Sequence, residues 1–125
     1  MDENELSNIV IGAAIKVHSV LGPGLMESAY EKALIYELRK DNLKVESQKN
    51  ISIKYENLVI EEGFRADIII DELLIIELKS VRKLEDIHFK QLLTYLRLTG
   101  LKLGLLINFN EVFLKDGIKR VVNGL

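Results

Sequence analysis

The sequence predicts an α/β domain, an α+β arrangement in which helices flank a central mixed β-sheet. Three observations predict this class: two helical patterns open the chain, three β segments follow, and a third helical pattern precedes further strands. This order, ααβββαββ, favours a mixed sheet packed against helices. The 125 residues match the usual size of one domain, so we expect a single domain over residues 1–125.

The two N-terminal helices are indicated by apolar side chains at spacings of three and four residues. The first stripe consists of Ile9, Ala13, Val17 and Val20. It predicts a helix over residues 4–21, which Gly22-Pro23-Gly24 ends. A second helix with the same spacing is expected over residues 25–40.

The strands are indicated by alternating apolar residues between turn signals. We expect β segments over residues 44–60, 64–70 and 74–79. Glu56-Asn57 and Asp71-Glu72 supply the turn signals. A helix then ends at Gly100, where a C-terminal glycine belongs. The remaining expected elements are this helix over residues 84–99, a buried strand over residues 103–109, and a pairing of residues 112–114 with 118–122.

The composition excludes several classes of site. There is no cysteine, which removes disulfides, thiolate metal sites and cysteine nucleophiles together. The two histidines, His18 and His88, lie far apart in the sequence, which argues against zinc. A net charge of -2 argues against a protein that coats nucleic acid by bulk charge, but it allows a local basic patch.

No membrane span is expected. The longest unbroken stretch of apolar residues and glycine covers residues 9–15, far fewer than the roughly 20 residues of a spanning helix. The N-terminus is acidic, whereas a secretory signal begins with basic residues. We therefore expect a cytoplasmic protein.

The register of the hairpin around Asp71 follows from its apolar pattern. A two-residue turn would place the carboxylate of Glu77 on the apolar face. A three-residue loop, residues 71–73, instead gives one face that is entirely apolar, and a one-residue slip would exchange the two faces. That apolar face carries Ala66, Ile68, Ile70, Leu74, Ile76 and Leu78.

On the opposite face, the same register places Asp67 directly across from Glu77. Directly opposed like charges destabilise a sheet. A divalent cation between the two carboxylates would reverse the repulsion, and oxygen ligands suit Mg²⁺ or Mn²⁺. Lys79 would point its ammonium into the same space. The alternative is a solvated face on which Lys79 simply offsets the charge of Glu77.

Four motifs that occur in order suggest a known family. Residues 24–30 read G-x-x-E-x-x-Y at the start of the second helix, and Arg65-Ala66-Asp67 opens a strand of the hairpin. Glu77-Leu78-Lys79 follows, and residues 91–96 read Q-L-L-T-Y-L on the next helix. These motifs resemble the GxxExxY family of small prokaryotic proteins, within the PD-(D/E)XK nuclease superfamily. The resemblance extends through the closing stretches and covers nearly the whole chain.

The resemblance implies a restriction-endonuclease-like core and roles for the matching residues. Asp67 and Glu77 would hold a metal ion, Mg²⁺ or Mn²⁺, and Glu27 would complete the metal site directly or through water. Lys79 would orient or deprotonate the attacking water and stabilise charge on the phosphorane. Ala66 stands where the superfamily's signature has proline, a change that the superfamily tolerates.

Four positions also allow an alternative interpretation. Gln91 and Tyr95 resemble the Q-x-x-x-Y element of RecB-like nucleases and share a helix face, but that face is also compatible with a simple half-exposed surface. Glu27 lies in the first turn of a helix, where the helix dipole alone favours an acid. Tyr30, one turn later, would either hydrogen-bond Glu27 or pack in the core.

The sequence therefore predicts a Mg²⁺-dependent nuclease that hydrolyses the phosphodiester bonds of nucleic acid, with DNA as the expected substrate. Arg82, Lys83 and Lys90 would supply the local basic patch. One alternative is a non-catalytic nucleic-acid-binding or regulatory protein that retains the nuclease fold. Another is a structural homodimer with an incidental acidic cluster, joined through the apolar first helix or the edge strands near the C-terminus.

Overall fold

The computed structural model describes residues 1–125 and contains one five-stranded sheet, with the strand order β1-β2-β3-β4-β5. The strands are β1 (Val45–Tyr55), β2 (Leu58–Ile70), β3 (Leu74–Lys79), β4 (Leu103–Asn108) and β5 (Ile118–Val122). The helices are α1 (Glu3–Leu21), α2 (Glu27–Arg39), α3 (Asp86–Thr99) and the short 3-10 helix η1 (Leu114–Gly117). β3 and β4 run parallel, and the other neighbouring strands run antiparallel. The predicted mixed sheet with flanking helices is confirmed.

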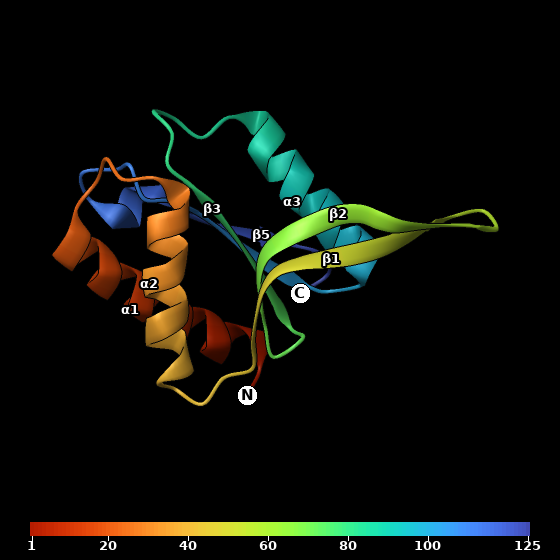
Figure 1. Ribbon diagram of the computed structural model, residues 1–125, viewed down its shortest axis with the longest axis horizontal. Coiled ribbons are helices and arrows are strands. Elements are labelled where there is room, and N and C mark those ends of the chain that lie inside the picture. Colours follow the sequence, from red (N-terminus) through yellow and green to blue (C-terminus); the bar gives the residue numbers. More distant parts are fainter.

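Helices cover both faces of the sheet (Figure 1). α1 and α2 lie on one face, while α3, which connects the parallel strands β3 and β4, lies on the other. The larger apolar cluster contains 18 buried residues, from α1, α2, the sheet and the segment between β4 and β5. The smaller cluster packs Leu92 and Leu96 of α3 against residues such as Ile75 and Leu106. Leu92 and Leu96 are four residues apart and therefore share one face of α3.

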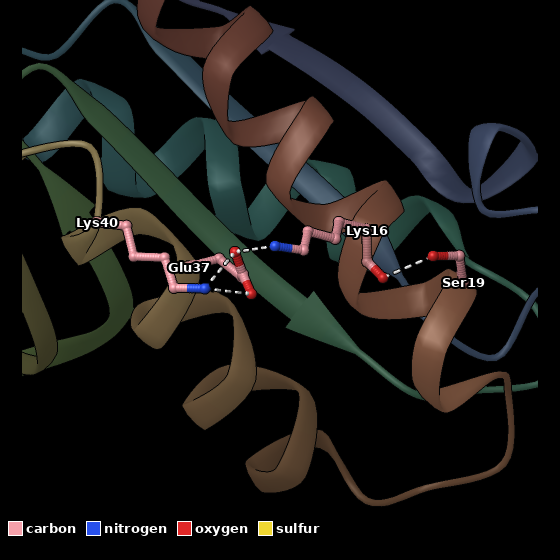
Figure 2. A network of polar contacts seen from close by, with 4 residues as sticks. All are labelled: Lys16, Ser19, Glu37 and Lys40. Atoms are coloured by element: carbon pink, nitrogen blue, oxygen red, sulfur yellow. Dashed lines mark hydrogen bonds and ion pairs between the residues drawn. The ribbon is translucent and has the colours of Figure 1, made fainter.

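Polar contacts tie the surfaces of α1 and α2 together (Figure 2). Glu37 of α2 accepts hydrogen bonds from Lys16 of α1 at 3.1 Å and from Lys40 at 3.3 Å. The Lys16 ammonium accordingly lowers the pKa of Glu37 below its ordinary value. Because these side chains are solvated, their ion pairs add little to stability, and the buried apolar contacts hold the two helices together.

The hairpin register is confirmed: Ile68, Ile69 and Ile70 pair with Ile76, Ile75 and Leu74. This leaves residues 71–73 as the loop, with Asp71 and Glu72 both at positive φ. The placement of Ala66 beside Ile68 on one face was wrong. Ala66 packs in the smaller cluster on the α3 side, whereas Ile68 packs on the side of α1 and α2. The strand therefore changes face near Asp67.

Other differences lie at the ends of elements. Residues 112–114 do not form a strand, because the chain turns into η1, and β5 pairs with β4 instead. The segment expected over residues 44–60 divides at the Glu56-Asn57 turn, and β2 continues unbroken from Leu58. The β1–β2 hairpin extends past the helices as an arm (Figure 1).

The loop between α1 and α2 is held by Tyr30. Its buried hydroxyl donates to the carbonyl of Gly22 at 2.5 Å and accepts the N–H of Leu25 at 3.0 Å. Its ring stacks on Phe109 with the centroids 4.5 Å apart. Tyr30 therefore packs in the core and hydrogen-bonds the loop backbone rather than Glu27, and it fixes where α2 begins.

We expect Tyr30→Phe to lower the free energy of unfolding by about 1–3 kcal/mol, because it leaves a carbonyl and an N–H without their buried partner. Urea denaturation would measure the change. Tyr36→Phe is the matched control, since the Tyr36 side chain is 65% exposed and should tolerate the loss of its hydroxyl. Equal stability of Tyr30→Phe and wild type would contradict the assigned role.

Candidate active site

The sheet opens at Asp67. The Cα pairs between β2 and β3 stop at Ile68 and Ile76, one residue short of Asp67. On the other side, β1 pairs Ser47 with Ile68 and Lys49 with Ala66, again passing over Asp67. Asp67 thus belongs to neither ladder, and its backbone must find partners elsewhere.

The carboxylates of Glu77 and Asp67 accept backbone N–H groups at this opening. Glu77 Oε2 accepts the N–H of Asp67 at 2.8 Å, and Asp67 Oδ2 accepts the N–H of Leu78 at 2.9 Å. These side-chain bonds replace the missing ladder bonds and hold the two carboxylates next to each other. Asp67 and Glu77 therefore lie next to each other as predicted, although these side-chain bonds, and not a ladder pair, join them.

The position of Glu77 disfavours its ionised form. Burial, and next the nearby Asp67 carboxylate, raise the pKa of Glu77 to about 8, although the Lys79 ammonium opposes the shift. Burial, followed by the negative charges of Glu77 and Asp67, also raises the pKa of Tyr95. The surrounding protein thus compensates the negative charge at this place only in part.

The donor set fits a divalent cation. Each carboxylate gives one oxygen to a backbone N–H, while Glu77 Oε1 has no hydrogen bond and Asp67 Oδ1 has only a long one, 3.4 Å from Gln48. Hard carboxylate oxygens are the ligands that Mg²⁺ and Mn²⁺ prefer. No group of three acidic or histidine side chains converges closely enough to hold a metal ion. Two protein ligands suffice for Mg²⁺, which keeps several waters and binds substrate phosphate.

Glu27 lies on the groove that leads to this pair. The groove, of about 470 Å³, is lined by Glu27, Ser28, Glu31, Gln48, Arg65, Asp67 and Leu78. Glu27 is the exposed first residue of α2, so its place also matches the helix-dipole alternative. Glu27 and Asp67 thus lie on one groove but form no hydrogen bond with each other.

Sequence reasoning missed two groove residues, Glu31 and Gln48. Glu31 lies one turn after Glu27 on α2, and its Oε1 accepts a hydrogen bond from Gln48 Nε2 at 2.6 Å. Burial is the main cause that raises the pKa of Glu31. The four-residue spacing from Glu27 was a signal for Glu31, since it puts both acids on one helix face. Gln48 had no comparable signal.

The remaining predicted residues lie at different depths. Lys79 ends β3 and is half-buried. Tyr95 is also half-buried, and its ring stacks on Phe64 at a centroid distance of 4.0 Å. Gln91, one turn earlier on α3, is exposed and makes no hydrogen bond. His88 is used in the cap of α3, where its Nδ1 accepts the N–H of Glu85.

The fold and this pair of carboxylates agree with the comparison against protein families. Residues 4–121 match the PD-(D/E)XK nuclease superfamily. The protein belongs to this superfamily. The comparisons with curated proteins and with solved structures found no match.

Members of the PD-(D/E)XK superfamily are generally nucleases that use divalent metals such as Mg²⁺ or Mn²⁺. The five-stranded mixed sheet and its three α-helices are consistent with the predicted restriction-endonuclease-like core. The superfamily match does not extend to the GxxExxY designation, which stays a prediction. None of the helices is both long and apolar enough to span a membrane.

The raised pKa of Glu77 predicts a pH-dependent stability in metal-free buffer. At a pH below 4.5, the ordinary pKa of a glutamate, the Glu77 carboxyl is protonated in both the folded and the unfolded state. Between 4.5 and about 8 the unfolded chain loses this proton while the folded protein keeps it, so the free energy of unfolding falls as the pH rises.

Glu77→Gln should remove this part of the pH dependence, because the amide cannot ionise and still offers an oxygen to the N–H of Asp67. The free energy of unfolding of the variant, relative to that of wild type, should therefore increase as the pH rises. Urea denaturation between about pH 5 and 9 in the presence of a chelator would measure this difference. Glu62→Gln, at an exposed position of β2, is the control and should keep the wild-type profile. Parallel profiles for Glu77→Gln and wild type would contradict the prediction.

Proposed function

We propose that this protein is a metal-dependent nuclease that hydrolyses phosphodiester bonds of DNA, with Mg²⁺ or Mn²⁺ held by Asp67 and Glu77. The observation that carries the proposal is the pair of adjacent carboxylates at the opening of the sheet, each with an oxygen left over after bonding the backbone. Membership in a superfamily of nucleases supports the same reaction.

The four acidic and basic residues of the site have distinct roles in this proposal. Asp67 and Glu77 hold the cation, and Glu27 completes its site through water from the rim of the groove, because the three carboxylates do not converge closely enough for direct ligation. When bound, the cation offsets charge on the phosphoryl oxygens and lowers the pKa of water. Lys79 orients the attacking water and offsets the negative charge that develops on phosphorus-bound oxygens.

Residues on the α3 side of the site position the substrate. Tyr95 is fixed by its stack on Phe64 and lies near enough to Glu77 to feel its charge. Gln91 is exposed on the same helix face and is free to contact a phosphate or sugar. Arg65 in the groove, together with Arg82 and Lys83 after β3, would neutralise backbone phosphates.

We also assign the chain to the GxxExxY group on the contacts of its motif. Gly24 has a φ of 98°, which favours glycine, and Tyr30 holds the loop that contains it. Glu27, between them, begins α2 at the groove. Dimerisation stays a prediction, for which Val20 and Leu21 offer exposed apolar surface at the end of α1.

The proposal is tested by metal binding and by cleavage. Calorimetry should show Mg²⁺ and Mn²⁺ binding to wild type and its loss in Asp67→Asn and Glu77→Gln, whose side chains still accept the backbone N–H groups. Cleavage of plasmid and oligonucleotide DNA should require the metal and fall by about a hundredfold or more in both variants. Lys79→Ala should lose cleavage to a similar extent but keep metal binding.

Glu62→Gln is the control for cleavage, because it removes an exposed carboxylate of β2 outside the groove. Cleavage that persists in chelator, or that survives Asp67→Asn, would contradict the proposed chemistry. Metal-dependent DNA binding without any product would instead identify a non-catalytic protein that retains the fold. A protein with neither metal nor nucleic-acid affinity would contradict both readings.

A further inference from the structure

Gln48 has a backbone conformation that sets it apart from the rest of the sheet. Five residues other than glycine have positive φ: Asn42, Gln48, Glu56, Asp71 and Glu72. Four of them lie in turns, but Gln48, at φ 49°, lies inside strand β1. L-residues rarely adopt this region, and they keep it only where the surrounding structure enforces it.

This conformation takes Gln48 out of the ladder at the position of Asp67. The β1–β2 pairs continue regularly at Ser47 and at Lys49 but omit Gln48 and Asp67 between them. The side chain of Gln48 lines the groove, where Nε2 donates to Glu31 Oε1 at 2.6 Å and to Asp67 Oδ1 at 3.4 Å. One amide therefore joins an acid on α2 to an acid on β2.

We propose that Gln48 is a positioning residue that fixes Asp67 through its amide, with Glu31 as the anchor of that amide. Leu78 N–H holds Asp67 Oδ2, so the contact from Gln48 to Oδ1 sets the plane of the carboxylate. The metal-binding part of this inference rests on the proposed function. Glu31 accordingly acts on Asp67 only indirectly, by holding the amide of Gln48.

The choice of residue supports the inference. A glycine would adopt a φ of 49° without strain, but it could not join Glu31 to Asp67. The donor is an uncharged amide, so it orients both carboxylates without forming an ion pair that would compete with a cation. Polar groups that orient metal ligands in this way typically change metal affinity about 10- to 100-fold when they are removed.

The first experiment uses the two glutamines of the chain, Gln48 and Gln91, as each other's reference. In metal-free wild type, ¹⁵N relaxation should show the side-chain amide of Gln48 ordered and that of the exposed Gln91 mobile. Glu31→Ala should release the amide of Gln48 and leave Gln91 unchanged. An amide of Gln48 as mobile as that of Gln91 in wild type would overturn the proposal.

The second experiment compares Gln48→Gly with Glu56→Gly, which is a matched control at another positive-φ residue of the same hairpin. Glycine fits both positions, so neither variant should lower the melting temperature. Gln48→Gly should weaken calorimetric Mg²⁺ binding about tenfold and raise the Mg²⁺ concentration for half-maximal cleavage equally, with kcat unchanged at saturating Mg²⁺. Glu56→Gly should match wild type in all four quantities.

Glu31→Ala should weaken Mg²⁺ binding to a similar degree, and the double variant should be no weaker than either single one, because both act through one contact. Unaltered Mg²⁺ binding in Gln48→Gly would overturn the proposal. If wild type binds Mg²⁺ but cleaves nothing, the proposed nuclease fails, and the binding comparison still decides the role of Gln48. If wild type binds no metal, the proposed metal site fails, and the amide relaxation alone decides whether Gln48 holds Asp67.

Discussion

The exchange of hydrogen bonds between Asp67 and β3 is the constraint on which the site depends. A sheet that opens along a strand leaves backbone N–H groups without ladder partners, and inside a protein these groups must be satisfied. Here Glu77 satisfies Asp67 while Asp67 satisfies Leu78. The backbone thus fixes the positions of the two carboxylates, and either residue replaced by an apolar one would leave an N–H unpaired. Structure and proposed chemistry depend on the same bonds.

The opening of the sheet also explains which parts of the fold the sequence could predict. The loop of residues 71–73 followed from the apolar pattern, because a one-residue slip would have buried a carboxylate among isoleucines. Regular alternation placed Ala66 on the wrong face, because alternation holds only while the strand stays in its ladders. Beyond Asp67 the strand turns its apolar side to α3, and no local pattern marks the change.

The groove acids show a second limit of sequence reasoning. The facing of Asp67 and Glu77 is a property of one hairpin, so it could be predicted from local register. The nearness of Gln48 to Asp67 depends instead on an irregular register between Ile51 and Ile53 and on a positive φ within β1. A regular hairpin around the Glu56-Asn57 turn would have aligned different residues. Glu31 was within reach of prediction from its spacing to Glu27, but its link to Asp67 requires Gln48.

The distribution of ion pairs gives the site its electrostatic character. The five salt bridges of the molecule join Lys16, Lys40, Lys44 and Lys49 to Glu37, Glu46 and Glu72. None of them involves the acids of the groove or Glu77, although Lys79 and Arg65 lie close by. The N–H groups that bond Asp67 and Glu77 orient these carboxylates but carry no full charge. The free-energy cost of burying the ionised Glu77 therefore remains, in line with its raised pKa. A permanent ion pair would lower that cost but would also occupy the oxygens that a cation needs. Orientation by neutral donors, without neutralisation by a lysine or arginine, suits the proposed metal site, which would take its positive charge from a cation in solution.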